Sequence, residues 1–115
     1  MDSIQELKGI IENFVKEREW NRFHSPKNLA MALSGEAAEI LELFQWLTEE
    51  ESYNLDEDKR EKLKQEIGDV MVYLLNLSSK FGIDPVEAGI YKMGLNGLKY
   101  PVEKAKGNAK KYNEF

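Results

Sequence analysis

SGEAAEILELFQW, at residues 34–46, and QEIGDVMVYLL, at residues 65–75, are apolar segments that each contain a pair of acidic side chains. The acids of each pair are three residues apart, so in a helix they project from one side of it. Acidic groups are costly within apolar surfaces unless they are paired with a positive charge or bind a cation. A divalent metal site is therefore the leading interpretation. The four acids are Glu36 and Glu39 in the first segment and Glu66 and Asp69 in the second.

The surroundings of the acids favour that interpretation over an ordinary solvated surface. In a helix, Glu36 shares a face with Leu33 and Ile40, which are three and four residues away. Small residues near the acids allow two helices to approach closely: Gly35, Ala37, Ala38 and Gly68. Four carboxylates brought together in this way would repel one another unless they were protonated or neutralised. The competing interpretation is that acid pairs at this spacing are common on solvated helix faces.

Breaks in the hydrophobic pattern divide the chain into four main helices. Their predicted bounds are residues 3–19, 26–47, 57–80 and 85–98. Three of them follow a residue that is typical of an N-cap, and prolines occupy the first helical position after two of these caps. The predicted caps are Ser25, Asp56 and Asp84. Gly82 is typical of a helix end.

The predicted fold is all-α, with a single domain of residues 1–115 in which four helices form a bundle. A tail from about residue 101 has room for another short helix, and the polar segment at residues 48–58 is predicted to be a loop. The run VMVYLLNL, residues 70–77, is apolar nearly all round, and such helices are usually buried on every side. The third helix is therefore expected at the centre of the bundle or at an interface between subunits.

The composition argues against several kinds of protein. The 115-residue chain has no cysteine, which excludes disulfides, thiolate metal ligands and a cysteine nucleophile. Its net charge of −5 argues against a general nucleic-acid-binding protein. The sequence shows neither a signal-peptide pattern nor an apolar run long enough to span a membrane. We therefore expect a cytoplasmic protein that binds neither nucleic acid nor membrane.

The available ligands narrow the choice of metal. A di-iron carboxylate bundle would supply Glu-x-x-His pairs, but His24 is the single histidine and lies outside both acid pairs. A zinc site is disfavoured, because zinc prefers histidine nitrogen and cysteine sulfur as ligands, and this chain has one histidine and no cysteine. Oxygen ligands suit Mg²⁺, with Mn²⁺ as a substitute, and Mg²⁺ usually binds carboxylates together with substrate phosphates. The residues therefore favour a magnesium site that acts on a phosphorylated substrate.

Longer motifs surround the acids and continue towards the end of the chain. They are WNRFHSPKNLAMALSGEAAEILELFQW at residues 20–46, EIGDVMVYL at residues 66–74, and later KM, KYP and KKY elements. From about Ile4 to Tyr112 the chain resembles the MazG-like nucleoside triphosphate pyrophosphohydrolases, and in particular their dCTP pyrophosphatase branch. An ExxE…ExxD pattern alone is weakly specific, whereas its combination with FHSPKNL, FQW and KYP is strong.

The resemblance implies hydrolysis between the α- and β-phosphates of a nucleoside triphosphate, which yields the monophosphate and diphosphate. It also implies a homotetramer built as a pair of dimers, in agreement with the apolar third helix. The implied catalytic residues, which would also bind Mg²⁺, are Glu36, Glu39, Glu66 and Asp69. Their spacing does not identify the general base.

The resemblance places aromatic and polar residues beside the nucleoside. Trp20 and Trp46 flank the acid-bearing helix at its two ends and are expected beside the base, with burial in a core or interface as the alternative. His24 has two interpretations of equal weight, which are a nucleotide contact and a hydrogen bond or cap within its loop. Asn28 has the same two interpretations, with a place in the pocket a little favoured.

Further substrate-binding candidates lie later in the sequence. The resemblance implies that Lys92 and Asn96, on one helix face with Tyr100, approach the phosphates or sugar together with Tyr73. A solvated face is the alternative for Lys92. The basic tail at residues 110–112 is expected to be an ordinary solvated tail, and closure over the triphosphate is its alternative.

The predicted function is Mg²⁺-dependent pyrophosphohydrolysis of nucleoside triphosphates, with dCTP or modified deoxynucleotides favoured, and a role in clearing the nucleotide pool. One departure leaves the base preference open, because some relatives carry a histidine where this chain has Ile11. Two alternatives are a related hydrolase acting on dUTP or phosphoribosyl-ATP and a helical scaffold with a vestigial acid cluster. The complete set of four acids disfavours the scaffold, and the two tryptophans favour a pocket in which a base can stack.

Overall fold

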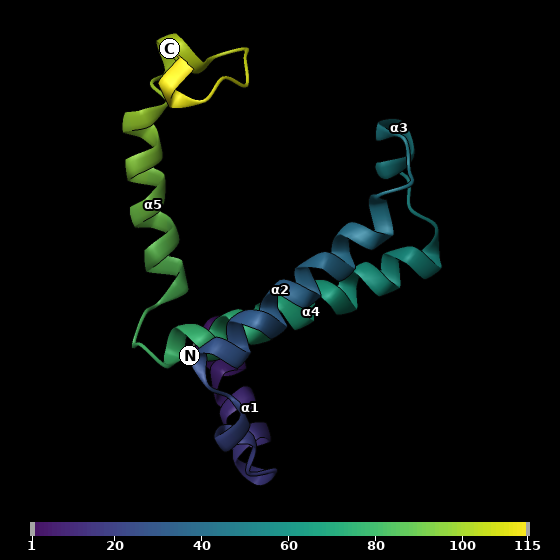
Figure 1. Ribbon diagram of the computed structural model, residues 1–115, viewed down its shortest axis with the longest axis vertical. Coiled ribbons are helices and arrows are strands. Elements are labelled where there is room, and N and C mark those ends of the chain that lie inside the picture. Colours follow the sequence, from purple (N-terminus) through teal and green to yellow (C-terminus); the bar gives the residue numbers. More distant parts are fainter. Residues whose placement is uncertain (1, 115) are drawn as a thin grey trace. The chain divides into compact units, whose positions relative to one another are not determined.

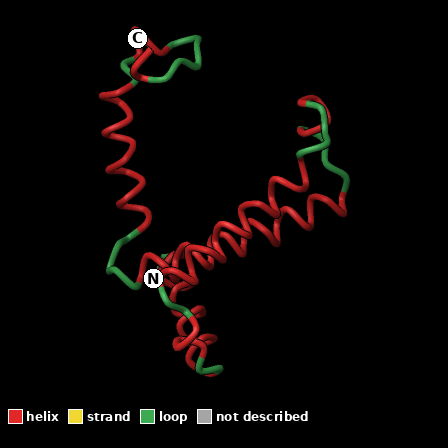
Figure 2. Tube along the Cα trace, in the orientation of Figure 1, coloured by secondary structure: helices red, strands yellow, loops and turns green. Residues whose placement is uncertain are grey.

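The computed structural model describes residues 2–114, and all the regular structure within them is helical (Figures 1 and 2). This confirms the all-α prediction with four main helices. The main helices are α1 (Ser3–Glu17), α2 (Pro26–Phe44), α4 (Glu57–Ser79) and α5 (Pro85–Lys99). The shorter helical segments are η1 (Trp20–Phe23), α3 (Glu49–Ser52), α6 (Val102–Ala105) and η2 (Tyr112–Glu114).

Polar side chains just before the helices fix where they begin. The Ser25 hydroxyl accepts a hydrogen bond from the backbone N–H of Asn28 at 3.1 Å. Asp56 accepts one from the backbone N–H of Lys59 at 2.8 Å, and Asp84 caps α5 in the same way. These bonds satisfy donors that the first turn of a helix leaves free. They confirm the three predicted caps.

Two predicted helix ends were too late in the sequence. α1 ends at Glu17, because the backbone is left-handed at Glu19 (φ 54°) and the chain then enters the 3₁₀ turn η1. α2 ends at Phe44, three residues before the predicted end. Gly82 also has a left-handed backbone (φ 63°), which glycine adopts without strain, and it follows the end of α4 as predicted.

The prediction of a loop at residues 48–58 was wrong, because this segment contains α3. Thr48 and Glu51 form a reciprocal capping box there. The Thr48 hydroxyl accepts from the Glu51 backbone N–H at 3.1 Å, and the Glu51 carboxylate accepts from the Thr48 N–H at 2.8 Å. Such a pair stabilises one helical turn by local hydrogen bonds, even where few apolar groups are available for burial.

The chain divides into two compact units, one ending at Gly82 and one starting at Ile83, and each is described by itself. In the first unit, α2 and α4 lie side by side along most of their length, and the segment that contains α3 joins them (Figure 1). α1 packs against the later half of α4. The prediction of one domain over residues 1–115 stays a prediction.

The core of the first unit lies where α1 meets α4. Ile11 and Val15 of α1 are buried against Leu75 of α4. Half-buried apolar side chains surround them, and these are Ile4, Leu7 and Val72. Because Val72 is one helical turn from Asp69, this packing also places α1 beside one of the predicted site residues.

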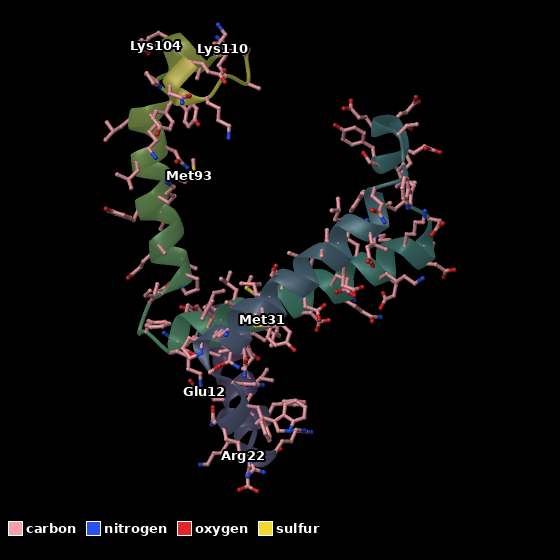
Figure 3. The ribbon with its side chains drawn as sticks, viewed as in Figure 1. Glu12, Arg22, Met31, Met93, Lys104 and Lys110 are labelled. Carbon is pink, nitrogen blue, oxygen red and sulfur yellow. The ribbon has the colours of Figure 1, made fainter. Side chains whose placement is uncertain are left out.

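The apolar second half of α4 is only partly enclosed by the first unit. Leu75 is 1% exposed, whereas Met71 and Leu74 are each 37% exposed, and Ile67, just before this half, is 53% exposed. On the neighbouring helix α2, Met31 is 63% exposed (Figure 3). The first unit by itself therefore does not bury α4 on every side.

The second unit contains α5, α6 and η2, and its tail folds onto the end of α5. The rings of Tyr100 and Tyr112 meet edge to face with their centroids 6.3 Å apart. The ammonium group of Lys99 lies 5.0 Å from the centre of the Tyr112 ring. Lys104 and Lys110 also belong to this C-terminal segment (Figure 3). Across residues 2–114, no helix combines the length and the apolar character needed to cross a bilayer.

Candidate active site

Three of the four predicted carboxylates converge where α2 lies against α4. One carboxylate oxygen from each of Glu36, Glu66 and Asp69 lies within 4.8 Å of the other two. Glu36 comes from α2, and the other two come from α4, where they are one helical turn apart. The i, i+3 spacing and the packing of the two helices together produce this acid cluster.

Glu66 carries the clearest sign that the acid cluster suits a cation. Its Oε2 atom is fully buried and, while the neighbouring acids are ionised, has no hydrogen-bond partner within residues 2–114. A buried carboxylate oxygen without a partner is unfavourable. A divalent cation held among three carboxylates would supply the missing positive charge, and an all-oxygen donor set suits Mg²⁺, Mn²⁺ or Ca²⁺. The residues present therefore fit a divalent metal ion.

Crowding of the acids alters the protonation of Glu36. The pKa of Glu36 is raised from 4.5 to about 7. The main cause is a hydrogen bond that its protonated form shares with Glu66, followed by partial burial and the negative charges of Asp69 and Glu66. Without a cation, the acid cluster therefore holds a proton that an isolated glutamate would have lost.

This shift predicts how metal-free stability depends on pH. Because the folded state binds a proton at Glu36 more tightly than the unfolded state does, the stabilising effect is complete below pH 4.5 and is lost as the pH rises through about 7. Relative to Glu36→Gln, the wild type should therefore lose thermal stability across this window in EDTA. Thermal unfolding of both proteins at a series of pH values measures the difference. A difference in melting temperature that does not change with pH would contradict the shift.

Glu39 lies next to the acid cluster and outside it. It is three residues beyond Glu36 on α2, and its side chain is exposed. The structure thus brings three of the four predicted acids together and leaves the fourth one helical turn away.

A cavity of about 320 Å³ opens beside the acid cluster, between α1, η1 and α4. Most of its lining is apolar and comes from Leu7, Ile10, Ile11, Phe14, Val15, Trp20 and Val72. Its polar lining residues are His24, Asp69, Tyr73 and Asn76. We call it the aromatic cavity. An apolar pocket with a few polar groups is typical of a site for a small organic ligand.

Trp20 forms an aromatic wall of this cavity. Its ring meets Phe14 edge to face at 5.6 Å between centroids, and it meets His24 in the same manner at 6.1 Å. These contacts hold the indole while 42% of the residue stays exposed. Trp20 can therefore offer an open ring surface to a planar ligand.

Comparisons with known proteins agree with this combination of acids and cavity. Residues 31–115 match the MazG-like family, and over 115 residues the chain is 36% identical to dCTP pyrophosphatase 1 of Bos taurus. The chain belongs to the MazG-like family. The same protein from Homo sapiens is also 36% identical, and each alignment covers 98% of this chain and 68% of the relative.

A solved structure supports the same relationship. A pyrophosphatase from Archaeoglobus fulgidus superposes on this MazG-like chain with a TM-score of 0.82 and 40% sequence identity. The match covers 88% of this chain and 94% of the archaeal one. The likeness therefore extends beyond the acid motifs to the arrangement of the fold.

Two other predicted pocket residues of the MazG-like chain lie away from the aromatic cavity. The side-chain amide of Asn28 donates to the backbone oxygen of Phe23 at 3.0 Å, which ties η1 to the start of α2. Trp46 is 87% exposed and follows the other end of α2. The 19 residues of α2 correspond to a length of about 28 Å, and the two tryptophans lie beyond its opposite ends. One chain therefore does not bring both tryptophans to the same ligand.

The remaining predicted residues divide between the two units. Tyr73 lines the aromatic cavity from α4. Lys92 and Asn96 belong to α5 in the second unit, where Lys92 is exposed and the Asn96 amide contacts the Met93 sulfur at 3.7 Å. Asn76 is a cavity residue that the sequence interpretation missed, although it is the one polar residue in the run VMVYLLNL apart from Tyr73.

Proposed function

We propose that this MazG-like chain is a Mg²⁺-dependent pyrophosphohydrolase that converts a nucleoside triphosphate and water into the monophosphate and diphosphate. The observation that carries the proposal is the position of Asp69, which belongs to the acid cluster and also lines the aromatic cavity. A metal-binding end thus adjoins an end that suits a planar base. Membership of the MazG-like family and the pyrophosphatase relatives support this type of reaction.

The acids would hold the metal ion that stabilises the phosphates of the substrate. Glu36, Glu66 and Asp69 would hold the cation, with Glu39 one turn further along α2. When bound, Mg²⁺ supplies positive charge that stabilises the phosphates and activates water. A carboxylate can accept the proton of the attacking water. The water oxygen then forms a bond to phosphorus while the bond to the oxygen that bridges the α- and β-phosphates breaks.

The aromatic cavity would bind the base of the nucleotide. Trp20 would stack on the base, since its ring is fixed by Phe14 and His24 and is still partly exposed. Tyr73 lies one helical turn beyond Asp69 on α4 and lines the same cavity. It is therefore placed to contact the sugar between the base and the phosphates.

We further propose a homotetramer formed as a pair of dimers. The exposed apolar side chains along α4 support it, because an apolar surface of this kind is usually covered by a partner. The separation of Trp20 from Trp46 supports it as well. If both indoles contact one base, a second copy must supply Trp46, since a helix of 19 residues lies between them in one chain.

The favoured substrates are dCTP and modified deoxynucleotides, and the proposed role is to clear such nucleotides from the cytoplasmic pool. The dCTP pyrophosphatase relatives support this choice. A survey of initial rates with each dNTP, in Mg²⁺, Mn²⁺ and EDTA, tests it. We expect the highest kcat/KM with dCTP, activity with either metal and none in EDTA. A rate that is unchanged in EDTA, or no turnover of any nucleotide, would sink the proposal.

A further inference from the structure

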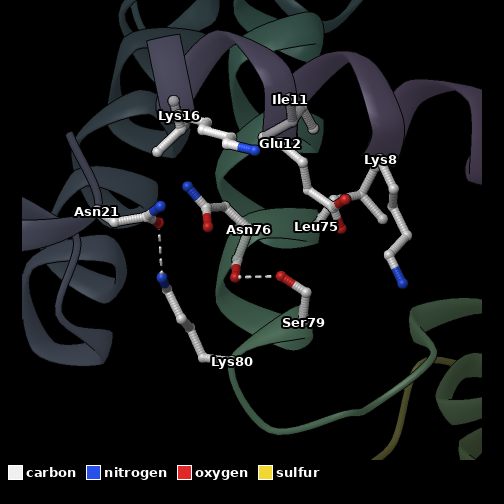
Figure 4. Close-up of a pocket in the computed structure, with 10 residues that line it drawn as sticks. Lys8, Ile11, Glu12, Lys16, Asn21, Leu75, Asn76, Ser79 and Lys80 are labelled. Atoms are coloured by element: carbon white, nitrogen blue, oxygen red, sulfur yellow. Dashed lines mark hydrogen bonds between the residues drawn. The ribbon is translucent and has the colours of Figure 1, made fainter. Parts of the chain in front are cut away.

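Asn76 is a buried amide in the apolar half of α4, where that helix meets α1. It is 8% exposed. It lines the aromatic cavity, and it also lines a second cavity of about 320 Å³ together with Lys16 and Lys80 (Figure 4). A buried amide among apolar side chains is costly unless it is hydrogen-bonded. The partner of the Asn76 side chain therefore indicates what this residue does.

The partner is the ring of His24, which lies between η1 and α2. The Asn76 side-chain nitrogen is 3.1 Å from Nδ1 of His24, and the two residues are 52 positions apart in the sequence. An amide carries both a donor and an acceptor, so it can pair with Nδ1 in either tautomer of the ring. The pKa of His24 is lowered by burial and, to a smaller extent, by Lys80, so the ring is neutral near pH 7 and suits a neutral partner. Asn76 thus fastens His24 to α4.

His24 in turn is one of two aromatic rings that contact Trp20. The centroids of the Trp20 and His24 rings are 6.1 Å apart, and those of Trp20 and Phe14 are 5.6 Å apart, with edge-to-face geometry in both pairs. Phe14 is 45% exposed on α1, whereas His24 is half-buried and bonded to a buried residue of α4. The better enclosed support of the indole ring therefore depends on Asn76.

The segment that carries Trp20 has little else to hold it against α4. It is a single 3₁₀ turn, η1, and such turns have poorer hydrogen-bond geometry than α-helices. Within residues 2–114, two side-chain hydrogen bonds join η1 and His24 to α4. One is the bond between Asn76 and His24, and the other runs from the Lys80 ammonium group to Oδ1 of Asn21 at 3.3 Å on the exposed surface (Figure 4). Asn76 supplies the more buried of the two.

We propose that Asn76 is a positioning residue for nucleotide binding, which holds the Trp20 ring ready to stack on the base by fixing His24. The inference rests on the proposed function, which places the base against Trp20. A ring that is already held in place loses less conformational entropy when the nucleotide binds, so the affinity is higher. Loss of the Asn76 amide should therefore weaken nucleotide binding and leave the chemistry at the acid cluster unchanged.

Time-resolved fluorescence anisotropy of Trp20 tests the support without any nucleotide. The chain has two tryptophans, so Trp46→Phe leaves Trp20 as the single one. In this background, Asn76→Ala and the bulkier Asn76→Leu should each increase the nanosecond motion of the indole. Ser79→Ala is the matched control and should not change it. Ser79 lies on the same helix, lines the second cavity but not the aromatic one, and donates to the backbone oxygen of Asn76 at 2.9 Å (Figure 4).

Steady-state kinetics with dCTP and Mg²⁺ test the consequence for binding. Asn76→Ala and Asn76→Leu should each raise KM roughly twofold to tenfold, which is the factor that one hydrogen bond contributes. Their kcat should stay within about twofold of the wild type, because uniform binding is lost and not transition-state stabilisation. Partial unfolding lowers the measured kcat but not KM. In a Trp20→Ala background, Asn76→Leu should have no further effect on KM, because the ring that it positions is absent.

The outcomes separate this inference from the proposed function. Greater motion of Trp20 and a higher KM in the Asn76 variants, both absent from Ser79→Ala, support the inference. Unchanged motion of Trp20, an unchanged KM, or an effect of Asn76→Leu on KM that is equally large in the Trp20→Ala background overturns it and leaves the pyrophosphohydrolase intact. If the wild type hydrolyses no nucleotide, the proposed function fails, and the role of Asn76 in binding fails with it even where Trp20 becomes more mobile.

Discussion

Asp69→Asn is expected to lower kcat/KM for the preferred dNTP on the order of a thousandfold. The substitution removes a carboxylate from the acid cluster at the point where the aromatic cavity begins. The helical fold should persist, since the substitution keeps the shape of the side chain. Without metal, the variant should be as stable as the wild type or more stable, because one of three repelling charges is gone. Steady-state kinetics with Mg²⁺, together with circular dichroism and thermal unfolding in EDTA, measure these effects.

Glu42→Gln is the matched control for this experiment. Glu42 is an exposed carboxylate on α2, one helical turn beyond Glu39 and outside the acid cluster. Its replacement removes the same charge and should leave kcat/KM nearly unchanged. Glu39→Gln should also lower the turnover, because Glu39 lies one helical turn from Glu36 and its carboxylate would help to hold a cation at the acid cluster. Full activity in both Asp69→Asn and Glu39→Gln would show that the metal site is placed wrongly.

Leu75→Ala is expected to destabilise the protein by about 2–5 kcal/mol. Leu75 is 1% exposed and joins Ile11 and Val15 in the core between α1 and α4, so its truncation leaves a cavity that the helices cannot easily fill. Urea denaturation followed by circular dichroism, at one fixed protein concentration, measures the change.

Lys62→Ala tests whether that loss is specific to the core. Lys62 is an exposed residue of the same helix, and alanine is a good helix former, so the variant should stay within about 0.5 kcal/mol of the wild type. If Leu75→Ala were no more harmful than Lys62→Ala, the junction of α1 and α4 would not be the core that the structure describes.

Local signals in the sequence were sufficient to predict most of the helices. Ser25, Asp56 and Asp84 could be identified as caps because a cap acts on residues two or three positions away. α3 was missed because the polar character of its segment outweighed the T-x-x-E pattern at Thr48 and Glu51, which is also a local signal. The end of α1 depends on the left-handed backbone at Glu19, which propensity does not predict for glutamate.

The candidate site was only partly predictable, because it depends on contacts between distant segments. The i, i+3 spacing indicated that the acids share helix faces, but the packing of α2 on α4 determines that Glu36 joins the cluster and Glu39 does not. The hydrogen bond between His24 and Asn76 joins residues 52 positions apart, and no local pattern connects them. The separation of Trp46 from Trp20 was predictable, by contrast, because the two residues lie beyond opposite ends of one helix, α2.

Identification of the products formed from dCTP tests the central claim most directly. The protein is incubated with dCTP and Mg²⁺, and the products are separated by anion-exchange chromatography and assigned by ³¹P NMR. A hydrolase that cleaves between the α- and β-phosphates must yield dCMP and diphosphate in equal amounts, and EDTA must abolish both. Formation of dCDP and inorganic phosphate, or unchanged dCTP in the presence of Mg²⁺, would contradict it.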